Sequence, residues 1–231
     1  MTNFLVRQAD TLSGEVLDTP IAIIGAGAIG SFVALSLAKM GFHNLEVWDD
    51  DVVSVENMNC QFYPLTALDR PKVDALSELI SSFTGISIVG VQGKFGESRR
   101  RYRTGPYIII SAVDSMEARK FIYDTSGIIA HTIIDPRMSI EYAHIQCVDL
   151  GDPEQTESYR KSLFSDDEAV QERCTNKSIM YTVLTISGLV CKMVKDRVTE
   201  KSYVKNVMYA IGDNEMMAFQ HKAKGGDDGE N

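Results

Sequence analysis

Cysteine is scarce in this chain of 231 residues, and its four cysteines never form a C-x-x-C pair. Structural zinc sites are usually built from such pairs, so we expect no zinc. The wide spacing also argues against the dense disulfide framework of small secreted domains. The cysteine content therefore favours a protein of the reducing cytoplasm.

Long apolar runs and an excess of basic charge are missing as well. The apolar runs are far shorter than the ~18 residues that a membrane-spanning helix needs. The first residues show no basic segment followed by an apolar one, the mark of a secretory signal. Acidic residues outnumber basic ones by 32 to 23, for a net charge of -9. We therefore expect neither a membrane protein nor a general nucleic-acid binder, and interpret the basic cluster at 99–103 as a solvated loop.

Apolar segments alternate with helical patterns through the first 135 residues. β-branched runs between turn residues predict buried strands, and apolar positions at helical spacing predict the helices between them. The expected strands cover 21–24, 44–49, 86–91, 106–113 and 131–135, and the expected helices end at Gly41 or cover 70–83 and 115–127. This alternation predicts a Rossmann-like, doubly wound and mostly parallel sheet of the α/β class, covered on both faces.

The second part of the sequence follows a different pattern. Residues 139–150 alternate in polarity and predict a long strand, which we expect in an antiparallel continuation of the sheet, with a last strand over 203–211. A mobile loop is expected over about 151–173, and an apolar helix over 178–198. Residues 1–210 form a single domain in this prediction, and residues 221–231 form a disordered tail.

A glycine-rich turn follows the first predicted strand. Gly25, Gly27 and Gly30 form G-x-G-x-x-G at the mouth of a helix. Glycines let the backbone turn tightly and approach phosphates, and the helix N-terminus offers unpaired N–H groups to an anion. Asp49 ends the second strand about twenty residues further on, a position that commonly binds ribose hydroxyls. The pattern predicts a nucleotide site without choosing among NAD, FAD and ATP.

Polar residues extend this pattern beyond the second strand. Asp51, Asn57 and Gln61 follow in order, and Lys72 stands at the start of a predicted helix. A cation at this position interacts unfavourably with the helix dipole. Binding of the ammonium to a polyphosphate would explain why a lysine stands there. An ordinary surface lysine is the alternative.

Asp114 lies just past the C-terminal end of a buried strand. Ligands of open α/β sheets bind at that edge, and a carboxylate facing a triphosphate can hold Mg²⁺. The alternative is that Asp114 caps the helix that follows.

Together these residues resemble the ThiF/MoeB/HesA family of E1-like adenylyltransferases, relatives of the ubiquitin-activating enzymes. The family pattern runs G-x-G-x-x-G, then D-x-D-x-V-x-x-x-N-x-x-R-Q, then R-P-K, then a hydrophobic strand ending in D-N. Here it stands as Gly25-Ala-Gly27-Ala-Ile-Gly30, Asp49-Asp-Asp51-Val-Val53, Asn57-Met-Asn-Cys60-Gln61, Arg70-Pro71-Lys72 and Asp114-Ser115. The spacing agrees over roughly residues 15–145, and more weakly to about residue 210.

The resemblance implies an ATP-dependent adenylyltransferase, a nucleotidyltransferase acting on the C-terminal glycine carboxylate of a small ubiquitin-like or sulfur-carrier protein. That carboxylate would become an acyl-adenylate, with ATP and Mg²⁺ bound. The implied roles are ribose binding for Asp49, phosphate binding for Asn57 and Lys72, Mg²⁺ binding for Asp114, and shaping of the same pocket by Asp51 and Gln61. Family members are commonly homodimers, so we expect a homodimer with residues 57–63 near the partner's site.

The chain departs from the family pattern at three points. Cys60 stands where the pattern has arginine, which removes a phosphate-binding charge that Arg70 or the 99–103 cluster could replace. Ser115 replaces the asparagine after the strand-end aspartate. The paired C-x-x-C motifs of many members are absent.

Cys174 is a candidate catalytic residue. It falls where the expected mobile loop meets the following helix, and some relatives carry a cysteine there that bonds the activated partner. A thiolate is favoured at a helix N-terminus, which suits a nucleophile. The alternative is a part-buried residue at the start of a helix.

Other functions stay open beside adenylation of a carrier protein. Cys60 in place of arginine favours a non-catalytic partner subunit that keeps the fold. Relatives of this fold also adenylate small molecules or take part in tRNA modification. The glycine turn alone is compatible with an NAD oxidoreductase, which tight binding of NAD without binding of ATP would indicate.

Overall fold

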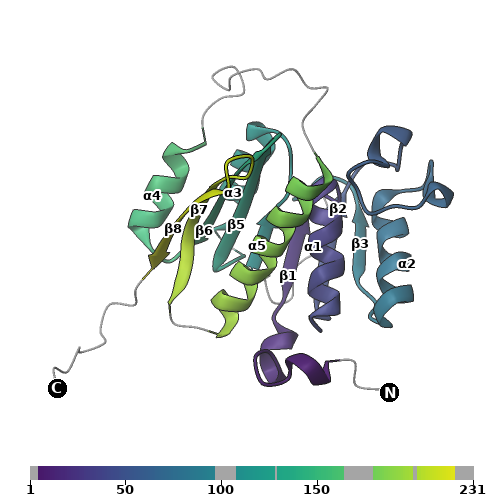
Figure 1. Ribbon diagram of the computed structural model, residues 1–231, viewed down its shortest axis with the longest axis horizontal. Coiled ribbons are helices and arrows are strands. Elements are labelled where there is room, and N and C mark those ends of the chain that lie inside the picture. Colours follow the sequence, from purple (N-terminus) through teal and green to yellow (C-terminus); the bar gives the residue numbers. More distant parts are fainter. Residues whose placement is uncertain (1–4, 97–107, 128, 164–178, 200–201, 222–231) are drawn as a thin grey trace.

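An eight-stranded sheet organises the computed structural model, which describes residues 5–96, 108–127, 129–163, 179–199 and 202–221 (Figure 1). Its strand order is β3-β2-β1-β4-β5-β6-β7-β8. The strands are β1 Ile21–Ile24, β2 Leu45–Asp49, β3 Val89–Gln92, β4 Ile108–Ser111, β5 Thr132–Ser139, β6 Tyr142–Asp149, β7 Tyr203–Ala210 and β8 Glu215–His221. The α-helices are α1 Ala28–Lys39, α2 Lys72–Thr84, α3 Met116–Ser126, α4 Pro153–Lys161 and α5 Met180–Thr199.

Parallel pairing joins the strands from β3 to β5. β1 is buried at every position, with Ile21 and Ile23 in one core and Ala22 and Ile24 in the other. α1, α2 and α5 cover the first face, and α3 and α4 cover the second. A strand buried on both faces needs apolar side chains on both, which the unbroken apolar run supplies. The predicted doubly wound, parallel sheet is confirmed.

Antiparallel pairing joins the strands from β5 to β8. The predicted antiparallel continuation of the sheet is confirmed, and it contains one strand more than the sequence predicts. α5 packs on β5, β6 and β7 and also contacts α1, so it spans both halves of the sheet. No helix in the described ranges is both long and apolar enough to cross a bilayer.

A helix occupies part of the segment expected to be a loop. α4 begins after Asp152, whose side chain accepts hydrogen bonds from the backbone N–H groups of Glu154 and Gln155. Pro153 takes the first helical position, which suits proline, and Tyr159 anchors the helix in the second core. The loop prediction is therefore wrong for these residues, because a single buried side chain gave too little periodic signal. Residues 164–173 of the expected loop lie outside the described ranges.

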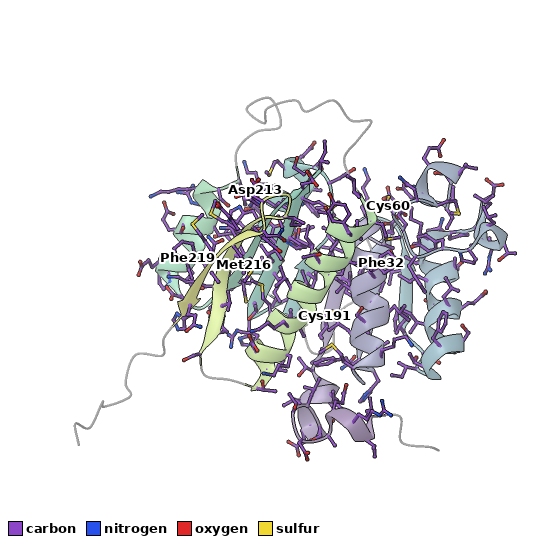
Figure 2. The ribbon with its side chains drawn as sticks, viewed as in Figure 1. Phe32, Cys60, Cys191, Asp213, Met216 and Phe219 are labelled. Atoms are coloured by element: carbon purple, nitrogen blue, oxygen red, sulfur yellow. The ribbon has the colours of Figure 1, made fainter. Side chains whose placement is uncertain are left out.

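β8 is a strand that the sequence analysis does not predict. It follows a tight turn with Asn214 at φ +58° and pairs with β7. Six of its seven residues are exposed, and Met216 and Phe219 project from it in Figure 2. A strand exposed on both faces has no apolar alternation to reveal it. The expected tail beyond residue 221 lies outside the described ranges.

The order of the strands reverses between β1 and β4. β1 pairs with β2 on one side and with β4 on the other, and all three run in the same direction. The segments that follow β1, β2 and β4 therefore start at one edge of the sheet. In open α/β folds such a switch point is where ligands bind.

Candidate functional site

The turn between β1 and α1 has two positions that only glycine fits. Gly25 has a φ of +98°, and a Cβ there would lie 2.5 Å from the carbonyl oxygen of Ala112. A Cβ on Gly30 would lie 1.9 Å from the carbonyl oxygen of Gly25. The Cβ position of Gly27 is open, since its nearest atom is Gln61 Nε2 at 3.9 Å. Two glycines thus serve the fold, and the third leaves room at the start of α1 for a phosphate.

Asp49, the last residue of β2, contacts the glycine turn directly. Its Oδ2 accepts a hydrogen bond from the backbone N–H of Ala26 at 2.6 Å, and its Oδ1 accepts one from that of Asp51 at 2.9 Å. The side chain is only 9% exposed. Asp49 therefore shapes the turn, and ribose binding stays a prediction for it.

Lys72 reaches the same place from the first residue of α2. Its Nζ lies 2.7 Å from Asp51 Oδ2 and 3.8 Å from Asp49 Oδ1, and its side chain is 7% exposed. Its backbone N–H donates to the carbonyl oxygen of Asp51 at 3.0 Å. Two carboxylates thus compensate the unfavourable position of a cation at a helix N-terminus. The ammonium is held at the edge of the sheet where the glycine turn lies.

The segment after β2 brings Gln61 to the glycine turn, whereas the side chain of Asn57 forms a local hydrogen bond. Asn57 Oδ1 accepts from the backbone N–H of Ser54 at 2.9 Å, which closes a capping box on a short 3₁₀ helix. Gln61 Oε1 is buried and has no hydrogen-bond partner among the described residues. Cys60 is 7% exposed, so its side chain points into the protein. The orphaned oxygen of Gln61 marks a polar group for which a ligand could supply the partner.

Two residues that the sequence analysis does not single out also hold this turn. Tyr63 donates its hydroxyl hydrogen to the carbonyl oxygen of Ala26 at 2.7 Å, and Ser31 Oγ accepts from the backbone N–H of Phe62 at 3.0 Å. Burial, assisted by the charge of Asp49, raises the pKa of Tyr63, so the hydroxyl stays a donor. Neither residue belongs to a motif, and only the structure shows that the chain after Gln61 returns to the glycine turn.

Asp114 lies in the turn between β4 and α3. Its side chain is exposed and has no hydrogen bond or ion pair with any described residue. Ser115, rather than Asp114, caps α3 by accepting from the backbone N–H of Ala118 at 3.2 Å. The alternative reading of Asp114 as the helix cap is therefore wrong, and its carboxylate is available to a ligand.

The donor groups at this edge fit ATP and Mg²⁺. Asp49, Asp50 and Asp51 each offer one carboxylate oxygen, and these oxygens lie within 4.8 Å of one another. With Asp114 across the switch point, the site offers the oxygen ligands that Mg²⁺ prefers. The open Cβ position of Gly27 leaves space for phosphate.

Arg70, one of the two groups proposed to replace the missing arginine of the motif, is paired with another residue. Arg70 forms two hydrogen bonds with Glu78, at 2.9 and 2.5 Å, on the exposed side of α2. The cluster at 99–103 and the candidate nucleophile Cys174 both lie outside the described residues. Cys60 thus leaves a neutral, buried side chain at this position of the motif.

Cys147 and Cys191 are core residues, and Figure 2 shows Cys191 where α5 meets α1. Burial raises the pKa of each thiol to about 12. At pH 8 both thiols therefore stay protonated, and the thiolate, which is the reactive form, is scarce. We expect iodoacetamide to leave both residues unmodified in the native protein, as read by peptide mass spectrometry, and to modify all four cysteines in urea. Rapid native labelling of either residue would contradict its burial.

Comparison with known proteins places this fold and motif set in a family. The ThiF family model matches residues 9–224. A NEDD8-activating enzyme E1 catalytic subunit of Schizosaccharomyces pombe is 33% identical over 120 residues, which are 51% of this chain and 27% of that protein. The sulfur carrier protein ThiS adenylyltransferase of Escherichia coli is 24% identical over 177 residues, 75% of this chain and 69% of that protein. The chain spans about a quarter of the length of the NEDD8-activating relatives.

Solved structures share the architecture at low identity. PaaA superposes with a TM-score of 0.67 at 19% identity, over 94% of this chain and 72% of that chain. Escherichia coli MccB, in a structure with succinimide, superposes with a TM-score of 0.65 at 14% identity, over 89% of this chain and 65% of that chain. These two likenesses concern the fold alone. By its sequence over residues 9–224, the chain belongs to the ThiF family.

Proposed function

We propose that this protein is an ATP-dependent adenylyltransferase. Its substrate would be the C-terminal glycine carboxylate of a small ubiquitin-like or sulfur-carrier protein, and its product an acyl-adenylate. The names of relatives that act on NEDD8 and on ThiS support this substrate class.

One observation carries the proposal. The ammonium of Lys72 is buried beside the carboxylates of Asp49 and Asp51 at the end of β2. The exposed carboxylate of Asp114 follows β4, on the other side of β1. A nucleotide with only a dinucleotide-type phosphate bridge would need no such cation at the glycine turn. A triphosphate would draw the ammonium from Asp51, which is 67% exposed and can be solvated when it loses this partner.

Adenylation requires that the protein position the carboxylate and ATP and neutralise the charge of the phosphates. It does not require a strong base. A carboxylate oxygen of the carrier attacks the α-phosphorus, the bond from that phosphorus to the bridging oxygen breaks, and pyrophosphate leaves with its electron pair. Lys72 would offset the charge on the phosphates, and Gly27 would let the backbone approach them. Asp114 would hold Mg²⁺, which when bound neutralises charge on the departing pyrophosphate.

ATP–pyrophosphate exchange tests this function. Purified protein is incubated with ATP, Mg²⁺ and labelled pyrophosphate, with and without candidate carriers that end in Gly-Gly. We expect label in ATP only when a suitable carrier is present. A carrier truncated by its last glycine is the matched control and should support no exchange. Absence of exchange with every carrier, despite ATP binding, would reject catalysis.

A non-catalytic partner subunit is the second candidate, and Cys60 favours it. The buried thiol brings no charge to the position where the family motif has arginine, and Arg70 is engaged with Glu78. ATP binding without any adenylate, alone or with a second family member, would support this role. A homodimer, a cytoplasmic location and a covalent role of Cys174 remain predictions.

A further inference from the structure

A buried carboxylate outside the proposed catalytic residues binds two arginines. Asp135 in β5 is 0% exposed. Its Oδ1 accepts from Arg119 Nε at 2.8 Å, and its Oδ2 accepts from Arg137 Nε at 2.8 Å and from the Tyr159 hydroxyl at 3.1 Å. A buried carboxylate is stable only when it is paired and hydrogen-bonded, and three donors meet that need here.

This cluster lies next to the strand end that carries Asp114. Ile110 of β4 pairs with Ile134 of β5, so Asp135 directly follows the last residue of β5 that pairs with β4. Two residues of β4 and its turn separate Ile110 from Val113, and Asp114 follows. The cluster therefore lies beside the end of β4, next to the turn that leads from β4 into α3.

Arg119 connects the buried carboxylate to that turn. It lies in the first turn of α3, and its Nη2 donates to the carbonyl oxygen of Pro136 at 3.2 Å. Its Nη1 and its backbone N–H both point at the carbonyl oxygen of Ser115, at 3.4 and 3.2 Å. Ser115 is the residue after Asp114 and the cap of α3. The start of α3 is thus fixed to β5 through one guanidinium.

Arg137 leads from the same carboxylate to a different element. Its Nη1 and Nη2 donate to the carbonyl oxygen and the Oγ of Ser162, both at 2.9 Å. Ser162 is the C-cap residue of α4. Both arginines are largely buried and donate to Asp135, but Arg119 contacts the start of α3 and Arg137 contacts the end of α4. A substitution of Arg137 is therefore a matched control for the same substitution of Arg119.

We propose that Arg119, held by Asp135, is a positioning residue for Asp114, so that the Mg²⁺-dependent part of ATP binding depends on this ion pair. The inference rests on the proposed function, in which Asp114 holds Mg²⁺. The side chain of Asp114 has no hydrogen bond or ion pair with a described residue, so we expect the backbone of residues 114 and 115 to decide the direction of its carboxylate. Residues that orient a metal ligand commonly affect metal affinity about 10- to 100-fold.

Calorimetric titration of ATP into the full chain, with excess Mg²⁺ and separately with EDTA, tests the proposal. The ratio of the two affinities measures the coupling between Mg²⁺ and ATP. Arg119→Lys keeps a cation beside Asp135 but lacks the planar fork that reaches two carbonyl oxygens. We expect it to lower the ratio roughly 10-fold. Arg137→Lys makes the same chemical change on the other side of Asp135 and should leave the ratio within about twofold of the wild-type value.

The outcomes separate this inference from the proposed function. An unchanged ratio in folded Arg119→Lys, or equal losses in both lysine variants, would overturn the positioning role. Ser115→Ala removes the cap of the same turn without touching the buried pair, and we expect it to lower the ratio too. A wild-type protein whose ATP affinity does not respond to Mg²⁺ would contradict the proposed function itself. Thermal unfolding of each variant shows that the folded protein is being compared.

Discussion

Lys72→Met is expected to lower ATP–pyrophosphate exchange by about 100- to 1000-fold, as removal of a single group that stabilises transition-state charge does elsewhere. Methionine keeps the apolar length of a side chain that is 7% exposed, but it removes the ammonium. Asp49 and Asp51 would then face the phosphates without a compensating charge. The measurement is the exchange rate with the carrier that supports exchange in wild type, together with the affinity for ATP.

Lys161→Met is the matched control for this variant. Lys161 lies at the end of α4, 71% exposed, and pairs only with the exposed Glu157 among the described residues. Surface ion pairs of this kind contribute little, so exchange and stability should stay at the wild-type level. Exchange by Lys72→Met within threefold of wild type would remove Lys72 from the proposed site.

Gly30→Ala is expected to destabilise the fold by about 3 kcal/mol, the upper part of the usual range for overpacking. The new methyl carbon would lie 1.9 Å from the carbonyl oxygen of Gly25 and 3.3 Å from the Cβ of Ala112. Backbone atoms cannot move aside as a flexible side chain can, so the start of α1 must shift away from β1. For a chain of this size the loss corresponds to a melting temperature roughly 6–12 °C lower, measured by thermal unfolding.

Two other glycine-to-alanine changes show whether position, rather than loss of glycine as such, causes the effect. Gly188 lies in α5 with no atom within 4 Å of its Cβ position, so Gly188→Ala should stabilise the protein by about 1 kcal/mol through helix propensity. Gly27→Ala meets no atom closer than 3.9 Å, so it should keep the fold yet weaken ATP binding. Equal melting temperatures for Gly30→Ala and Gly188→Ala would contradict the packing described for the glycine turn.

The parallel half of the sheet could be predicted because burial leaves a pattern in the sequence. β1 and β4 are apolar on both faces and read as continuous β-branched runs. β8 and α4 could not be predicted, since one is exposed on both faces and the other is held by the single buried side chain of Tyr159. A periodic pattern of apolar residues arises from buried side chains, and β8 and α4 bury few side chains.

The sequence could predict that some of the candidate residues lie together, but it could not predict their contacts, and their roles stay predictions. The spacing of the motifs named Asp49, Asp51, Gln61 and Lys72, and the fold brings all four to the edge of the sheet at the glycine turn. It did not indicate that Asp49 binds the turn itself, or that Asn57 uses its side chain to cap a 3₁₀ helix. Hydrogen bonds between segments distant in sequence carry no periodic signal, so only a three-dimensional structure reveals them.

The exposed edge strand β8 affects how the protein is expected to behave at high concentration. β8 ends the sheet within the described ranges, with Met216 and Met217 at 55% and 57% exposure and Phe219 at 48%. An unpaired, apolar strand edge is a template for another strand, and charged side chains normally prevent this contact. Only Glu215 carries a full charge along the strand. We therefore expect these seven residues to favour association of the protein at high concentration, despite its net charge of -9.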